Sequence, residues 1–360
     1  MNQAAGGKSV WSRRALLRNL IVLTGAGVSS SLLKYGAGGI PEILGQAGAA
    51  RGGRGAAAAR GTRLIMLGTQ GGPNVNLMRA ETSNVVVADG QPYLVDCGYG
   101  AVRGLVEAGI PLPSVQNVFL THLHDDHTVD LAALLSLKWT GGNNVPQPVA
   151  VYGPYGTKAM VDGAIAFFKA NADIRIVDEG RSVRPEAVFA GHDLTAATVT
   201  EVFRDERVTV KAVENAHFPD RAKEKMPYRS FAYRFDTPDR SIVFSGDTPY
   251  SASLVELARG ADYFVCEAMT LGSRQQFAGN AGGANGGGES IGRHVLETHS
   301  STEDVGRMAT EAKVKTVVLY HLVPGANRGN ATDDIYISEV RKTFDGPVIV
   351  GRDQLRIPQD

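Results

Sequence analysis

Short apolar runs alternate with amphipathic stretches along residues 62–355 of the chain. The runs are rich in Val, Ile and Phe and too short for helices, which is typical of buried strands. Two of them flank Asp89-Gly90, a dipeptide that predicts a tight hairpin turn. The expected strands cover residues 64–67, 85–87, 93–95, 118–120, 149–152, 208–213, 231–235, 242–244, 263–265 and 317–319.

Longer stretches with helical spacing lie between these runs. Residues 128–138 place Leu131, Leu134 and Leu135 on or near one face, which is typical of a helix that packs against a sheet. The β-β-α order at the start and the β-α-β order later predict an α/β protein whose mixed sheets are covered by helices. Further helices are expected at residues 157–169, 251–259, 302–313 and 332–344.

The first sixty residues do not follow this alternation. Arg13 and Arg14 precede an uncharged run, residues 19–33, which is shorter than the roughly 20 apolar residues of a transmembrane helix. A charged start before a short apolar run is typical of a secretory signal, and the arginine pair resembles the twin-arginine type. Residues 1–35 are therefore predicted to be a signal that directs the protein to the periplasm or outside the cell. An amphipathic N-terminal helix of the folded domain is the alternative.

Two stretches are dominated by glycine and alanine. Residues 36–62 hold 17 Gly or Ala among 27 residues, so they bury little and have much backbone entropy to lose. We interpret them as a linker, with the folded domain at residues 63–360. Residues 279–288 form the second stretch, which is expected to be a mobile surface loop.

Composition narrows the class of protein. The chain has 360 residues, of which 43% are hydrophobic, and this excludes a disordered chain. Two cysteines exclude a disulfide scaffold and a thiolate zinc cluster. Residues 61–360 carry 29 basic and 36 acidic side chains, a net charge of −7. No broad phosphate-binding surface is expected, because affinity for nucleic acid depends mainly on clustered Lys and Arg.

The strongest chemical signal follows the expected strand at residues 118–120. Residues 122–127 read His-Leu-His-Asp-Asp-His, and imidazole with carboxylate is a ligand set that suits zinc and related ions. His122 and His124 can point the same way from an extended segment. Asp126 and His127 follow where the chain turns, so one segment can serve two adjacent metal ions. A polar loop with incidental histidines is the alternative.

This His-x-His-x-Asp-His segment resembles the signature of the metallo-β-lactamase superfamily. The resemblance covers about residues 62–355 and implies an αββα four-layer sandwich with a metal site at the edge of its two sheets. Asp96 matches an aspartate that supports the metal loop without being a ligand. The implied ligands are His122, His124 and His217 for one ion, Asp126, His127 and His321 for the other, and Asp247 as the bridge between two divalent ions, Zn²⁺ or alternatively Mn²⁺ or Fe²⁺.

A further segment, residues 298–304, resembles the ribonuclease Z-like and arylsulfatase-like branch. The resemblance implies that His299 donates a proton to the leaving group and that Glu267 orients His299. The alternatives are a helix-start residue for His299 and a buried salt-bridge partner for Glu267. Cys97 and Cys266 follow apolar runs and are expected to be free buried thiols.

The resemblance implies a metal-dependent hydrolase that acts on ester bonds, with Asp126, His299 and Glu267 as catalytic residues. Paired metals lower the pKa of bound water toward about 7, which would supply the attacking hydroxide. We expect an arylsulfatase-like sulfate ester hydrolase. The alternatives are a ribonuclease Z-like phosphodiesterase, a lactone or β-lactam hydrolase, and a metal-stabilised binding protein without activity.

The expected partner is a small-molecule ester and no nucleic acid. An exported protein does not meet precursor transfer RNA, and residues 171–207, where the family's RNA-gripping arm lies, hold five arginines against eight acids. No stable membrane span is expected unless the signal stays uncleaved, and the sequence is compatible with a homodimer.

Overall fold

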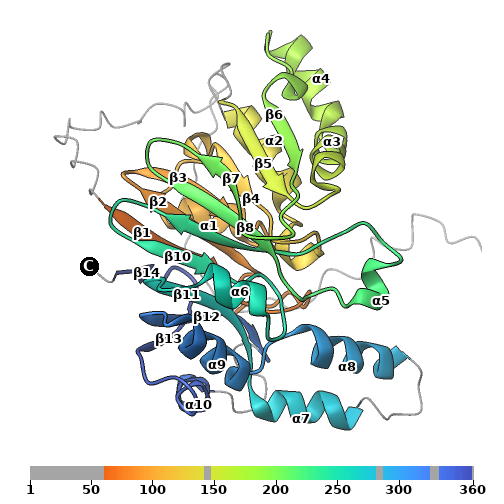
Figure 1. The fold of residues 1–360 in the computed structure, drawn as a ribbon. Helices are drawn as coiled ribbons and strands as arrows, with labels where there is room; N and C mark the ends of the chain where they lie inside the picture. The colour runs from red at the N-terminus through yellow and green to blue at the C-terminus, as the bar shows by residue number, and fades with distance from the viewer. Residues whose placement is uncertain (1–60, 142–146, 281–286, 325–331, 359–360) are drawn as a thin grey trace, which may run out of the picture. The chain divides into compact units, whose positions relative to one another are not determined.

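The apolar runs pair into two sheets of seven strands each (Figure 1). The computed structural model describes residues 61–141, 147–280, 287–324 and 332–358, all of them within one compact unit. The first sheet has the order β14-β1-β2-β3-β4-β5-β6 and the second β13-β12-β11-β10-β9-β8-β7. The first contains β1 (Thr62–Gly68), β2 (Ser83–Ala88), β3 (Gln91–Val95), β4 (Asn117–Phe119), β5 (Val149–Gly153), β6 (Phe189–Asp193) and β14 (Arg356–Ile357). The second contains β7 (Thr200–Arg204), β8 (Thr209–Glu214), β9 (Phe231–Asp236), β10 (Ser241–Phe244), β11 (Tyr263–Met269), β12 (Thr316–Val323) and β13 (Val348–Val350).

Strand direction changes within each sheet. β2 and β3 form the predicted antiparallel hairpin, with Asp89 and Gly90 both at positive φ in the turn. From β3 to β6 the pairs are parallel, and from β10 to β13 they are parallel again. Parallel neighbours need a crossover, which the helices between them supply.

Helices cover the outer faces of both sheets (Figure 1). Side chains of α1, α2 and α3 pack on the first sheet, and side chains of α6, α9 and α10 pack on the second. A third cluster, which includes Leu64, Phe119, Phe235 and Val318, fills the space between the sheets. The predicted αββα sandwich is therefore confirmed. The helices are α1 (Ala101–Glu107), α2 (Leu131–Gly141), α3 (Thr157–Phe167), α4 (Lys169–Asp178), α5 (Asp220–Lys223), α6 (Ala252–Leu257), α7 (Leu271–Asn280), α8 (Gly287–Thr298), α9 (Thr302–Ala312) and α10 (Asp333–Val340).

Some elements differ from the sequence-based expectation. The helix expected from residue 128 begins at Leu131, because Asp125–His127 form a 3-10 turn first. The helix expected at residues 157–169 ends at Phe167, and α4 follows it. β6 and β7 were not expected from the sequence, since most of their side chains are at least partly exposed and give no apolar run.

Several predictions lie outside the described residues. The signal segment and nearly all of the linker fall within residues 1–60, so these assignments and the domain boundary remain predictions. Most of the loop expected at residues 279–288 falls within residues 281–286, but its described ends belong to the helices α7 and α8. Cys97 and Cys266 are free and buried, as expected. Among the helices that are described, none is both long and apolar enough to span a membrane.

Candidate metal centre

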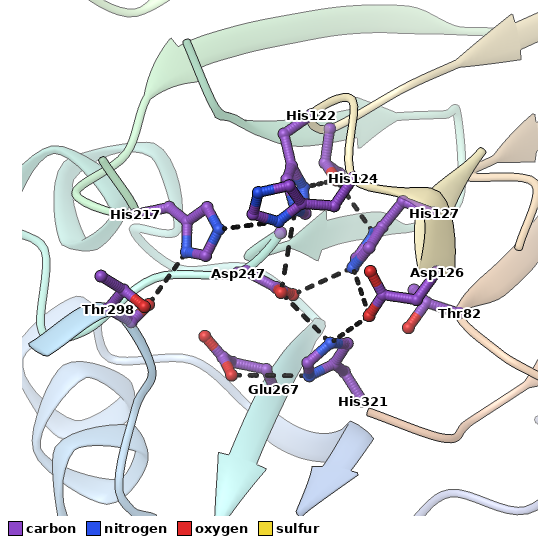
Figure 2. A network of polar contacts seen from close by, with 12 residues as sticks. Thr82, His122, His124, Asp126, His127, His217, Asp247, Glu267, Thr298 and His321 are labelled. Atoms are coloured by element: carbon purple, nitrogen blue, oxygen red, sulfur yellow. Dashed lines mark hydrogen bonds and ion pairs between the residues drawn. The ribbon is translucent and has the colours of Figure 1, made fainter. Parts of the chain in front are cut away.

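The predicted ligand side chains meet at the ends of strands from both sheets (Figure 2). Carboxyl ends of parallel strands open to the same edge of a sheet, so polar side chains placed there converge. β4 leads into residues 121–127, and Asp247 follows β10 after a tight turn at Gly246, which has φ 59°. His217 follows β8, and His321 lies in the last part of β12.

Asp96 fixes the loop that carries the first ligands. It is fully buried and follows β3. Its Oδ1 accepts a hydrogen bond from the Thr121 backbone N–H at 2.8 Å, and its Oδ2 accepts one from His127 Nδ1 at 2.9 Å. Because the proton of His127 is on Nδ1, the lone pair on Nε2 is available to a metal.

Three histidines form the first ligand group. His122 Nε2 lies 3.0 Å from His124 Nδ1, and His217 Nε2 lies 3.4 Å from the same atom. His217 Nδ1 donates to the Thr298 carbonyl at 3.1 Å, which leaves the lone pair on Nε2. Two nitrogens bound tetrahedrally to one zinc at about 2.0–2.1 Å would be roughly 3.4 Å apart. The spacing therefore fits a shared ion.

Asp126, His127, Asp247 and His321 form the second group. Asp247 Oδ1 lies 3.3 Å from His127 Nε2, and Asp247 Oδ2 lies 3.1 Å from His321 Nε2. Asp247 Oδ2 is also 3.9 Å from His122 Nε2, a member of the first group. Asp247 thus lies between the two groups, as Figure 2 shows, and is the side chain that could bridge two ions.

A β-bulge directs His321 into the centre. Glu267 pairs with Tyr320 and Ala268 pairs with Leu322, so His321 is the extra residue, and its φ is 42°. Bulges bend a strand and re-aim a side chain. A β-carbon on Gly71 would lie 2.8 Å from His321 Nδ1, so only glycine leaves this ring its place.

The two groups have opposite electrostatics when the side chains are considered alone. Burial lowers the pKa of His122 and His217 well below the usual value, so both stay neutral. Burial also opposes charge on His127 and His321, but Asp247 and its neighbours outweigh it and raise the pKa of both rings well above the usual value. A site that attracts protons so strongly would also attract a cation in their place.

Two buried atoms that lack a hydrogen bond support the same conclusion. Among the described residues, the buried atoms His127 Nε2 and Asp247 Oδ1 make no hydrogen bond, although they lie 3.3 Å from each other. Buried polar atoms without partners cost free energy, which a bound cation would recover. The residues present therefore fit two divalent ions, and their mixed nitrogen and oxygen donors suit zinc.

His299 and Glu267 lie beside the second group. His299 Nδ1 donates to Glu267 Oε2 at 2.8 Å, and it is 3.8 Å from Asp247 Oδ2. Burial lowers the pKa of His299, but Glu267 outweighs burial and raises it above the usual value. The bond at Nδ1 leaves Nε2 as the nitrogen that can present a proton elsewhere. Ser301 is the N-cap of α9, the helix that follows.

Three contacts at the centre were missed from the sequence. Thr121 binds Asp96, the Thr298 carbonyl orients His217, and the ring of His294 lies 6.2 Å from that of His124. A contact made by a backbone carbonyl, such as that of Thr298, cannot be predicted from the pattern of side chains in a sequence. His294 could have been noticed as a histidine five residues before His299.

The fold and the paired donor groups define a metal-dependent hydrolase of the metallo-β-lactamase class. The chain belongs to the beta-lactamase superfamily, because the protein-family model described as "Beta-lactamase superfamily domain" matches its residues 92–322. It is 30% identical over 275 residues to a ribonuclease Z of Mycobacterium sp. (strain KMS), covering 75% of this chain and 87% of that protein.

Solved structures agree on the fold. The metallo-beta-lactamase fold protein YhfI from Bacillus subtilis matches with a TM-score of 0.56 at 20% identity, over 82% of this chain and 98% of that chain. Human tRNase Z, short form, gives the same TM-score, identity and coverage.

The relatives correct one expectation. A small-molecule ester substrate without a nucleic-acid partner is wrong for this branch, because the relative at 30% identity is a ribonuclease, an enzyme that acts on RNA. The expectation used net charge and a missing basic arm. Net charge describes the whole surface, whereas cleavage of a phosphodiester depends on cations held at the reacting phosphate.

Proposed function

We propose that the protein is a metal-dependent phosphodiesterase of the ribonuclease Z type that cleaves RNA. The observation that carries the proposal is the His299–Glu267 pair beside Asp247. The relative named ribonuclease Z, at 30% identity, supports the phosphodiesterase alternative better than the arylsulfatase-like activity expected from the sequence.

In this proposal His122, His124 and His217 would hold one ion, Asp126, His127 and His321 would hold the other, and both would share Asp247. Two such ions, when bound, lower the pKa of water and stabilise negative charge on a phosphoryl oxygen. Asp96 and the Thr298 carbonyl keep the imidazole rings oriented, so little reorganisation is needed when substrate arrives.

The proton for the leaving oxygen comes from His299. Glu267 accepts the hydrogen bond from Nδ1 and stabilises the doubly protonated ring, so His299 Nε2–H is available as the donor. Thr248 N–H donates to the other carboxylate oxygen, Glu267 Oε1, which fixes the carboxylate in this orientation.

A parallel assay tests the proposal. The zinc-loaded protein is given a short RNA, bis(p-nitrophenyl) phosphate, p-nitrophenyl sulfate and a simple lactone, with Asp247→Asn as the inactive control. Cleavage of the RNA and the diester, with much slower sulfate and lactone turnover, is expected. Faster turnover of the sulfate than of either phosphodiester would overturn the proposal in favour of an arylsulfatase.

Export is a separate proposal that depends on sequence alone. If Arg13 and Arg14 belong to a twin-arginine signal, replacing both by Lys leaves the protein in the cytoplasm, whereas unchanged export excludes that signal. Export would confine the substrate to phosphodiesters outside the cytoplasm.

A further inference from the structure

A seventh histidine borders the metal centre and has no part in the roles described above. His294 lies on α8, and its ring centroid is 6.2 Å from that of His124, 5.8 Å from His217 and 5.8 Å from His299. Of the eight histidines in the chain, only His192 is elsewhere, stacked on Tyr152 at 4.9 Å.

His294 does not behave as a ligand of either ion. It belongs to none of the sets of donor atoms that converge within the described residues. It is exposed, whereas His122, His217 and His321 are buried. Within the described part of the chain, its carbonyl accepts a hydrogen bond from Thr298 Oγ1 at 2.7 Å, and its ring nitrogens have no partner. The ring is thus free to bind a molecule that enters from solvent.

The helix that carries His294 is anchored at the centre. Glu297, three residues further along α8, forms an ion pair with Arg221 of α5. Thr298 ends the helix, and its carbonyl accepts the hydrogen bond from His217 Nδ1. The position of His294 is therefore tied to that of a proposed metal ligand, which gives its ring a defined place beside the centre.

We propose that His294 is a substrate-binding residue whose ring N–H donates a hydrogen bond to a non-bridging oxygen of the scissile phosphate. This inference rests on the proposed function. An imidazole carries at least one N–H in either protonation state. The reacting phosphate must lie within reach of both the ions and His299, and His294 is about equally far from His217 and His299. A phosphoryl oxygen in that space has His294 beside it.

Four variants test this role: His294→Ala, His294→Gln, His294→Asn and, as the matched control, His192→Ala. The zinc-loaded proteins are compared with bis(p-nitrophenyl) phosphate as substrate and inorganic phosphate as a competing ligand. A hydrogen bond to a charged group predicts that His294→Ala raises KM for the diester about 10- to 100-fold and weakens phosphate inhibition by a similar factor. Turnover at saturation and zinc content should stay near wild type, and one of the two amide variants should recover part of the loss. His192→Ala should match wild type.

Other outcomes would overturn the proposal. A fall in zinc content in His294→Ala would make the residue a ligand or a support for His217. A loss confined to kcat, with KM and phosphate affinity unchanged, would make it a positioning residue for His299. No change in any quantity would show that the ring does not touch substrate.

The role of His294 can be tested even if the proposed function is wrong. If the wild-type protein hydrolyses no phosphodiester, the proposed function fails. Calorimetric titration of the zinc-loaded protein with inorganic phosphate then still measures the role of His294, because binding needs no turnover. Equal phosphate affinity in wild type and His294→Ala would reject the inference by itself.

Discussion

The two sheets supply the centre in different ways. The first sheet contributes all of its proposed ligands from one segment, residues 122–127, after β4. The second contributes His217, Asp247 and His321 from three separated places in the chain. In the first sheet a local turn and Asp96 set the geometry, whereas in the second the packing of strands against one another sets it. The first part of the centre is therefore a local structure and the second a tertiary one, and Asp247 connects them.

The largest loss of bound metal and of activity is expected when Asp247, which connects the two parts, is replaced. Asp247→Ala should lower metal occupancy at both positions and reduce activity by more than about 100-fold, since changes one shell further out already cost 10- to 100-fold in metal affinity. Metal analysis and diester turnover measure the effect. Asp125→Ala is the control, because Asp125 is an exposed carboxylate in the same segment. Loss of only one ion would show that Asp247 is a ligand of that ion alone and does not bridge the two.

The second-largest effect is a loss of turnover that is expected when His299 or Glu267 is replaced. His299→Ala should retain both ions and lose about 10²- to 10⁴-fold in turnover, the usual range for a general acid. The loss should shrink with leaving groups such as nitrophenolate, which depart without a proton, and Glu267→Gln should show the same trend more weakly. Rates along a series of leaving groups check this. A loss that is equal for every leaving group would reject the acid role.

Asp96 supports the ligand segment at residues 122–127, so replacing it tests the local part of the centre. Asp96 accepts hydrogen bonds from Thr121 and His127 with two separate oxygens, and asparagine offers only one acceptor oxygen. Asp96→Asn should therefore weaken metal affinity about 10- to 100-fold at the ion held by His127. Titration with a competing chelator measures it. Equal weakening of the ion held by His217 would contradict a local effect.

The smallest effect concerns the pH dependence of stability and comes from α2, a helix that covers the first sheet. Lys138 of α2 is buried, burial lowers its pKa to about 8, and its Nζ donates to the Pro113 carbonyl. Between pH 8 and about 10.5 the unfolded chain binds a proton here that the folded chain has lost, so stability should rise with pH by about 1–2 kcal/mol. Denaturant unfolding at several pH values shows this, and Lys138→Met should remove the rise. An identical slope in the variant would exclude Lys138 as its source.

The same contrast explains what could be predicted from the sequence. His122, His124, Asp126 and His127 form a motif that carries its own geometry, so the residues alone indicated a metal site. His217, Asp247 and His321 are single residues after apolar runs, and only the resemblance to a family linked them. His294 was missed because its place depends on how α8 docks, which no local pattern expresses.

Net charge was a poor guide to the substrate class for a related reason. It averages over the surface, whereas the centre concentrates six imidazoles and two aspartates in one buried place. The strands of the core were predicted well, because burial on both faces produces clear apolar runs. β6 and β7, which are half exposed, produced none.

The bulge at His321 has a consequence for insertions and deletions in this strand. Before it, Val318 and Tyr320 face the other sheet while Val317 and Leu319 face the helices; after it, Leu322 faces the helices although its number is even. The strand therefore changes phase at His321. Deleting this one residue would remove the ligand and the bulge together: Leu322 would follow Tyr320 directly, strict alternation would be restored, and Leu322 would keep facing the helices. A homologue in which this strand lacks only the bulge residue should therefore keep its packing beyond this point, whereas one that replaces the bulge by a regular strand of the same length must turn Leu322 toward the other sheet.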